Sequence, residues 1–179
     1  MFISLLPIII GMANGLKRTS STVAIGFSVT EDVAGTMKQL SVDLNLSPLD
    51  NEVFVVEAIN LEPDMPDAIA GTNTKVASSL TSTSQTALST LANSNCMATA
   101  ANYIRADPVA LVGFQQGQAE NPATTLEYIG IIATSDFFVQ VEGAGNAGAR
   151  GVAGKVYGYR ARADASTYAA LVQSEVLSA

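Results

Sequence analysis

One segment of this sequence matches a known binding pattern. Residues 143–148 (GAGNAG) fit G-x-G-x-x-G, the dinucleotide-binding pattern, letter for letter. In dinucleotide-binding proteins the glycines lead into a helix whose N-terminus faces the pyrophosphate. Here residues 149–154 (ARGVAG) continue as a glycine-interrupted strand. We therefore expect a flexible hairpin tip that can pack against another subunit, and no nucleotide site.

A short acidic segment offers oxygen ligands for a metal ion. Glu62, Asp64 and Asp67 could gather around calcium, which prefers carboxylate and carbonyl oxygens from a tight loop. Pro63 and Pro66 interrupt the segment, and three acids are few for a calcium loop. A solvated turn is therefore the favoured interpretation.

Charged residues alternate near the end of the chain. Arg160, Arg162 and Asp164 occupy every second position at the end of an expected strand. One interpretation is a surface charge cluster in which Asp164 also caps a helix. The other is an ion pair between subunits, which makes Arg160 and Arg162 candidate interface residues.

The composition restricts the chemistry that the chain can perform. It contains no histidine, no tryptophan and one cysteine. Histidine is the side chain that most often transfers protons near neutral pH, and structural zinc needs cysteine or histidine ligands. No lysine lies in a Ser-x-x-Lys setting that would activate a serine nucleophile. We therefore expect no enzyme, no catalytic residue, no metal ion and no cofactor.

The single cysteine and the net charge add two further expectations. Cys96 cannot form a disulfide within one chain, and we expect it to be a small buried hydrophobe, with an exposed thiol as the alternative. The net charge of −7 repels DNA, RNA and anionic lipid over the whole chain. Specific nucleic-acid binding is therefore not expected.

The run from Phe2 to Ile10 is the most hydrophobic in the chain, and the apolar segment extends to Leu16. No basic residue precedes the apolar run, as it would in a signal peptide, and the run is shorter than the roughly twenty residues of a membrane span. The segment either covers an apolar patch of its own domain, or docks on a neighbouring subunit or membrane surface with Lys17 and Arg18 at the headgroups. Its candidate interface residues are Phe2, Ile3, Leu5, Leu6, Ile8, Ile9 and Ile10.

Alternating patterns predict strands through most of the chain. One face of the segment 37–46 is apolar, with Leu40, Val42, Leu44 and Leu46. The segment 52–61 (EVFVVEAINL) is apolar on both sides and predicts a central strand. Further strands are expected at 74–79, 98–104, 109–114, 126–133, 137–141 and 152–161, and 82–91 is either a strand or a short helix. The serine- and threonine-rich middle can bury Val76, Leu80, Leu88 and Leu91.

The chain ends in an expected helix over 164–178. Asp164 can cap it, and one stripe carries apolar residues at i, i+3, i+4 and i+8: Tyr168, Leu171, Val172 and Val176. Such a helix must lie on an apolar surface of its own sheet or of a neighbouring subunit. Tyr168 and Leu171 are therefore candidate interface residues.

These elements predict a mainly β fold. Eight or nine strands with one C-terminal helix and no βαβ alternation indicate an antiparallel β-sandwich, either a jelly roll or an immunoglobulin-like fold. We expect an apolar N-terminal arm at 1–22 and one β-sandwich domain, including the helix, at 23–179.

Three segments carry a resemblance to a known family: 132–138 (IATSDFF), 159–168 (YRARADASTY) and 37–57. Together they resemble the single jelly-roll capsid proteins of tailless icosahedral viruses. The resemblance implies two four-stranded sheets, a virion location, no enzymatic activity, and assembly with copies of itself and other capsid proteins into capsomers. It also implies an apolar terminal arm that reaches a neighbour or a membrane.

Two other classes of function are alternatives. One is a cell-surface or filament subunit, adhesin-like or pilus-like, with the same sandwich fold. The other is a hydrolase that uses a pair of carboxylates, which composition leaves open although no spacing indicates it.

Overall fold

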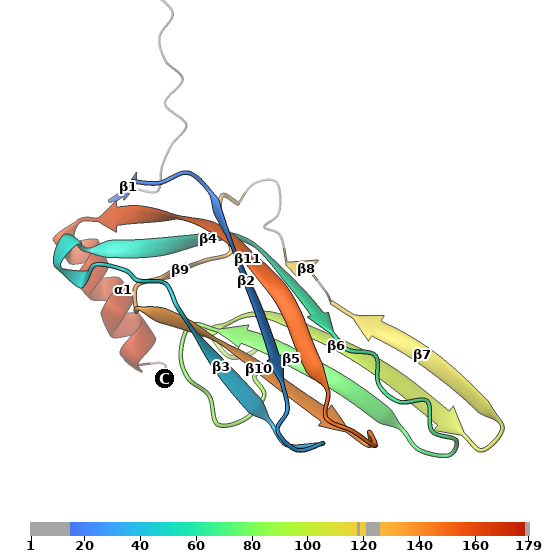
Figure 1. Ribbon diagram of the computed structural model, residues 1–179. Helices are drawn as coiled ribbons and strands as arrows, with labels where there is room; N and C mark the ends of the chain where they lie inside the picture. Colours follow the sequence, from blue (N-terminus) through green and yellow to red (C-terminus); the bar gives the residue numbers. More distant parts are fainter. Residues whose placement is uncertain (1–14, 118, 121–125, 178–179) are drawn as a thin grey trace, which may run out of the picture.

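The computed structural model describes residues 15–117, 119–120 and 126–177 of the chain (Figure 1). These residues form two antiparallel sheets and one C-terminal helix, as predicted, but the sheets contain six and five strands rather than the four each that the resemblance implies. The first sheet contains β1 (Leu16–Arg18), β2 (Val23–Thr30), β4 (Glu52–Pro63), β8 (Ala119–Glu120), β9 (Gly130–Ile132) and β11 (Gly151–Ala163). The second contains β3 (Lys38–Asp43), β5 (Thr74–Thr81), β6 (Cys96–Asp107), β7 (Ala110–Gln116) and β10 (Asp136–Ala144). The helices are η1 (Pro48–Asp50), a 3-10 turn, and α1 (Ala165–Leu177).

The strand order is that of a jelly roll. In the first sheet β11 lies between β2 and β4, and β9 also pairs with β4. In the second sheet the order is β3–β10–β5–β6, with β7 beyond β6. The pairs β2–β11, β3–β10, β4–β9 and β5–β6 are nested along the chain, and the innermost pair is a hairpin. Nested antiparallel pairs divided between two sheets form the double Greek key of the jelly roll, which decides between the two expected sandwiches.

The main core lies between the sheets. Phe27 of β2 and Phe137 of β10 meet edge to face across it, with ring centroids 5.9 Å apart. The apolar face expected over 37–46 packs on this core, although β3 ends at Asp43. The chain turns there because Asn45 has a φ of 50° and its N–H donates to the Asp43 carboxylate at 2.6 Å.

Strand β4 is central and buried on both faces, as its pattern predicts. Phe54 and Val56 belong to the core between the sheets. Val53 and Val55 point to the outer face of the first sheet, where they pack with alanines of β11 and with side chains of α1. The double-sided apolar pattern therefore reflects a helix that covers the outer face.

The helix confirms three of the four expected packing residues and corrects the fourth. The side chains that pack on the first sheet are Tyr168, Leu171 and Val172. Val176 is 63% exposed, and Glu175 is buried in its place. Successive helical residues lie about 100° apart, so residue 175 falls at the centre of the stripe that starts at 168, whereas residue 176 falls at its border.

The expectation for residues 82–91 is wrong, because residues 82–95 form neither a strand nor a helix. Hydrogen bonds hold this loop against the outer face of the second sheet. The buried Gln140 donates to Thr81 Oγ1 at 2.8 Å and accepts from the Ser79 hydroxyl at 2.8 Å, and the Ser89 N–H donates to Ser79 Oγ at 3.2 Å. Leu91 is 60% exposed, so polar contacts rather than leucine burial anchor the loop.

Two other expected elements differ in extent or position. Of the strand expected at 126–133, only Gly130–Ile132 pairs as β9. Just before β9, the Ile129 N–H donates a hydrogen bond of 2.8 Å to the Val56 carbonyl of β4. The glycine-rich segment 143–148 is not a hairpin within one sheet, because it joins β10 of the second sheet to β11 of the first. No helix in the described part of the chain is long and apolar enough to cross a membrane.

Candidate functional site

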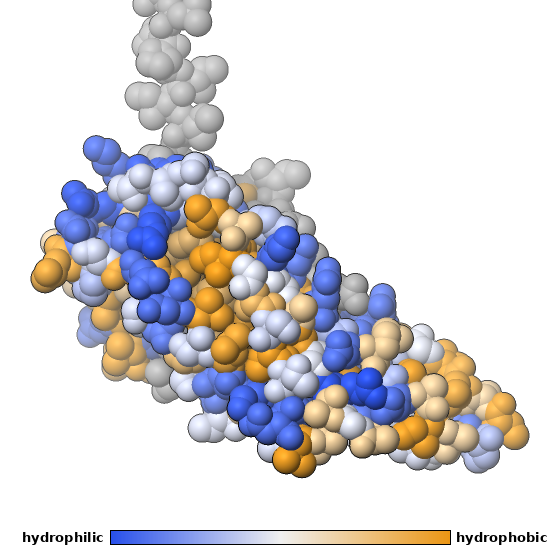
Figure 2. Space-filling model, in the orientation of Figure 1, coloured by the Kyte–Doolittle hydropathy of each residue, from blue (hydrophilic) through white to orange (hydrophobic). Residues whose placement is uncertain are grey.

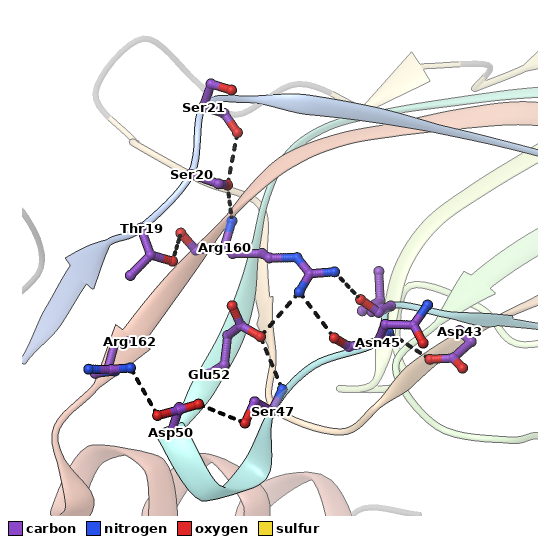
Figure 3. Close-up of polar contacts among 11 residues, drawn as sticks. Thr19, Ser20, Ser21, Asp43, Asn45, Ser47, Asp50, Glu52, Arg160 and Arg162 are labelled. Atoms are coloured by element: carbon purple, nitrogen blue, oxygen red, sulfur yellow. Dashed lines mark hydrogen bonds and ion pairs between the residues drawn. The ribbon is translucent and has the colours of Figure 1, made fainter.

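Arg160 of β11 fastens the connection between β3 and β4 to the first sheet (Figure 3). Its Nη2 donates to the Leu44 carbonyl at 2.7 Å, and its Nη1 donates to the Asn45 carbonyl at 3.0 Å. Nη1 also lies 3.2 Å from Glu52 Oε2, which accepts the Ser47 N–H at 3.0 Å. The guanidinium is therefore bonded within its own chain, and contact of Arg160 with another subunit stays a prediction.

The two charged residues that follow have different roles. Arg162 pairs with Asp50 at 3.0 Å, but both side chains are 58% exposed, and such pairs contribute little to stability. Asp164 caps α1, because its Oδ1 accepts the Thr167 N–H and the Ser166 hydroxyl, each at 2.7 Å. These bonds, that to the Thr167 N–H first, lower the pKa of Asp164. The expected cap is confirmed, and an ion pair of Arg162 between subunits stays a prediction.

Glu175 is a buried acid that the sequence did not reveal. Its side chain comes from α1, and the residue is 7% exposed. Its carboxylate accepts the Ala133 N–H at 3.2 Å and the Thr134 N–H at 3.0 Å. Burial raises the pKa of Glu175, and the bonds from Ala133 and Thr134 oppose this shift. The carboxylate thereby ties the helix to the chain that leaves β9.

Cys96 lies in the same cleft as Glu175, together with Leu171 and Ser174 of α1. The cysteine is half-buried, so it is neither the fully buried hydrophobe expected from the sequence nor the exposed thiol of the alternative interpretation. Its Sγ is 3.5 Å from the Ala98 carbonyl oxygen. The cleft therefore combines a thiol and a carboxylate, each already engaged in hydrogen bonds.

Acidic side chains bind the two ends of the glycine-rich segment. The Glu31 carboxylate, from a residue that is 4% exposed, accepts the Gly143 N–H at 2.8 Å and the Arg150 N–H at 2.9 Å. Asp67 pairs with the Arg150 guanidinium, and this bond is the main cause of its lowered pKa. Gly145 has a φ of +73°, and a Cβ on it would lie 2.5 Å from the Asn73 carbonyl oxygen.

The same contacts bear on the nucleotide and calcium interpretations. The segment leads into β11 rather than into a helix, so its N–H groups do not form the helix terminus that would bind a pyrophosphate. Of the three acids considered for calcium, Asp64 accepts the Gly151 N–H at 2.7 Å and Asp67 accepts the Ala147 N–H at 2.9 Å. Among the described residues, no three histidine, cysteine or acidic side chains are grouped to hold a metal ion.

The apolar N-terminal residues, from Phe2 to Ile10, lie outside the described residues. The basic pair that follows them is described. Arg18 lies over the ring of Tyr159 at 4.0 Å and 3.8 Å from Glu57, and its strand β1 pairs with β11. Residues 16–18, expected within the arm, therefore extend the first sheet.

The strand β7 is an exposed edge of the second sheet, which the sequence pattern did not indicate. Within the described residues, β7 pairs with β6 alone. All seven of its residues (ALVGFQQ) are exposed, including Leu111 at 47%, Val112 at 53% and Phe114 at 49%. The β6–β7 hairpin projects at the end of the molecule away from α1, and hydrophobic side chains gather there (Figures 1 and 2). The apolar run at 109–114 predicted a strand, but only the sheet order shows that it is an edge.

Comparisons with known proteins give little further information. No family model and no curated protein sequence matches this chain. Among solved structures, one titled Desmodium yellow mottle tymovirus matches with a TM-score of 0.24 and 13% identity, over 92% of this chain and 98% of that chain. This likeness is too low to establish a shared fold, and the jelly-roll class follows from the strand pairing described above.

Proposed function

We propose that this protein is a structural virion protein: a capsid subunit that associates with copies of itself, and with other capsid proteins, to form a shell. The nested strand order agrees with the fold that the resemblance of residues 132–138 and 159–168 implies. Because one fold serves many functions, a shell subunit must also have a surface that binds other subunits.

The observation that carries the proposal is the exposed apolar edge strand β7. Natural edge strands are usually protected from pairing by charged residues, proline, bulges or a covering segment. β7 contains neither a charged residue nor proline, and its large apolar side chains are about half exposed. Such an edge favours association with another chain, which is the basic requirement of a shell subunit.

The apolar N-terminal segment gives a second reason to expect association. Phe2, Ile3, Leu5, Leu6, Ile8, Ile9 and Ile10 are costly to leave in water. We propose that they contact a neighbouring subunit or a membrane surface in the assembled particle. Arg162, with its exposed side chain, is a further candidate for contact between subunits.

A filament or cell-surface subunit is the competing proposal, because a free strand edge can also join subunits in a line. Electron microscopy of the purified protein, with light scattering over a range of concentrations, separates the two. Closed shells or capsomers are expected. Linear fibres would support the filament instead, and a chain that stays monomeric at every concentration would contradict both.

A further inference from the structure

We propose that the free edge of β7 pairs with the β7 strand of a second copy of this chain, antiparallel and about a two-fold axis at Gly113. This inference deepens the proposed function, on which it rests, by naming one contact surface and the partner that it binds. Three properties of β7 favour this partner: backbone groups that face away from β6, side chains that match in this register, and the lack of charged residues.

The backbone of β7 is available for a second strand. In an antiparallel sheet, alternate residues of an edge strand direct their N–H and C=O groups away from the neighbouring strand. Within the described residues these groups of β7 meet no other strand, because β6 occupies only one side. A second strand at the usual spacing of about 4.8 Å would satisfy them and continue the sheet into the second molecule.

The side chains match when the axis lies at Gly113. Val112 of each copy then faces Phe114 of the other, so the pairing creates two contacts between a β-branched and an aromatic side chain. Leu111 faces Gln115, and the two central glycines pair with each other and add no side chain to either face of the sheet. The sequence ALVGFQQ is therefore compatible with pairing to itself in this register.

The distribution of charge favours a copy of the same chain over a charged partner. The chain carries a net charge of −7, yet β7 carries none. The charged residues opposite β7 in the sheet are Arg105 and Asp107 of β6, which lie on the side away from the free edge. Two β7 strands can therefore meet without opposing like charges, whereas a basic or acidic peptide would find no complementary side chain on the strand.

A cysteine at the proposed axis tests the register. Gly113→Cys in a Cys96→Ser background places two thiols at directly paired positions, where Cα atoms are close enough for a disulfide. A Cβ at this position meets no atom nearer than the Tyr103 carbonyl oxygen at 3.9 Å, so the substitution fits the fold. Mild oxidation should give a covalent dimer, measured on a non-reducing gel.

Leu111→Cys in the same background is the matched control. In the proposed register the two copies of this residue are four positions out of pairing, or about 13 Å apart along the strands, which is too far for a disulfide. It should stay monomeric on the gel. Equal crosslinking of both variants would overturn the register.

Charge substitutions test the partner. Val112→Lys with Phe114→Lys, and separately Val112→Glu with Phe114→Glu, oppose like charges across the axis and should each raise the dimer Kd by at least about tenfold in analytical ultracentrifugation. A mixture of the two variants should restore pairing. Leu49→Lys, at a residue of η1 that is 98% exposed, should leave the Kd unchanged. Circular dichroism should show equal melting temperatures for all variants.

The outcomes separate this inference from the proposed function. Shells that form without a Gly113→Cys crosslink would overturn the β7 pairing and leave the capsid proposal standing. A crosslinked dimer that forms no shell or capsomer would support the pairing and contradict the capsid proposal. A crosslink from Gly113→Cys to Phe2→Cys in place of the self-crosslink would assign the edge to the N-terminal segment and overturn the proposal.

Discussion

At the residue scale, three acidic side chains connect separate elements of this molecule. Glu31 closes the glycine-rich segment, Asp164 starts α1, and Glu175 holds the helix against the end of β9. Each carboxylate accepts backbone N–H groups near the end of a strand or helix, which is a common use of buried or capping acids. Their role is therefore to join elements.

Glu175 makes a prediction about pH. Burial raises its pKa in the folded chain above the usual 4.5, so the folded state favours the protonated form. Its contribution to the unfolding free energy is fully present below about pH 4.5 and is lost as the pH rises through the folded pKa. Glu175→Gln keeps an acceptor oxygen and removes the charge, so it should abolish this decline and stabilise the protein at neutral pH.

Urea unfolding between pH 4 and pH 8 measures this effect. Glu127→Gln is the matched control, because Glu127 is exposed and its replacement should leave the wild-type profile unchanged. A Glu175→Gln variant that is less stable than the wild type at neutral pH would show that the charged form is the one that stabilises the fold.

At the element scale, each sheet has an outer cover of different chemistry. Helix α1 covers the first sheet with apolar side chains, whereas the loop at 82–95 covers part of the second through hydrogen bonds to Ser79 and the buried Gln140. Close approach of the strands also requires small residues. A Cβ on Gly154 of β11 would lie 2.6 Å from the Phe27 ring, so the core depends on glycine there.

The packing of α1 makes a prediction about stability. Leu171→Ala removes an isobutyl group that packs on the first sheet and should lower the unfolding free energy by about 2 kcal/mol, the lower end for buried leucines, because the residue is only half-buried. Val176→Ala, at a site that is 63% exposed, should change it by less than about 0.5 kcal/mol.

Thermal melting of the isolated subunit and electron microscopy of the assembled particle give the two readouts for these variants. A Leu171→Ala chain with an unchanged melting temperature that no longer assembles would make α1 an interface element. A lowered melting temperature places the helix within the fold of the subunit.

At the scale of the whole molecule, the jelly roll is elongated, with α1 at one end and the projecting β6–β7 hairpin at the other (Figure 1). Apolar residues are exposed at both ends, with Val176 and Leu177 on the helix and Phe114 on β7. Under the proposed function, exposed apolar residues at two ends would let one subunit contact more than one neighbour, as a closed shell requires.

The N-terminal segment makes a prediction at this scale. Deletion of residues 1–14 leaves β1 intact, including Leu16, which packs beside α1. The shortened chain should therefore fold with an unchanged melting temperature but fail to assemble. A strongly lowered melting temperature would show instead that these residues belong to the core of their own subunit.

The sequence by itself determined those features that depend on local periodicity. Alternation at residues 40–46 predicted an apolar face that packs on the core, although the strand itself ends at Asp43, and the two-sided apolar run at Val53–Val56 predicted a central strand that the structure confirms. Asp164 likewise predicted its helix, because a cap needs only the next few residues. The missing histidines and the single cysteine limited the chemistry before any fold was known.

Only the tertiary structure decided which elements meet. Pairing of β2 with β11 joins segments more than a hundred residues apart, and no local pattern encodes which strand lies at an edge. The apolar run in β7 is therefore exposed although a similar run in β4 is buried. Burial of Glu175 and exposure of Val176 likewise depend on how α1 lies on the first sheet, because the surface beneath a helix is supplied by distant residues.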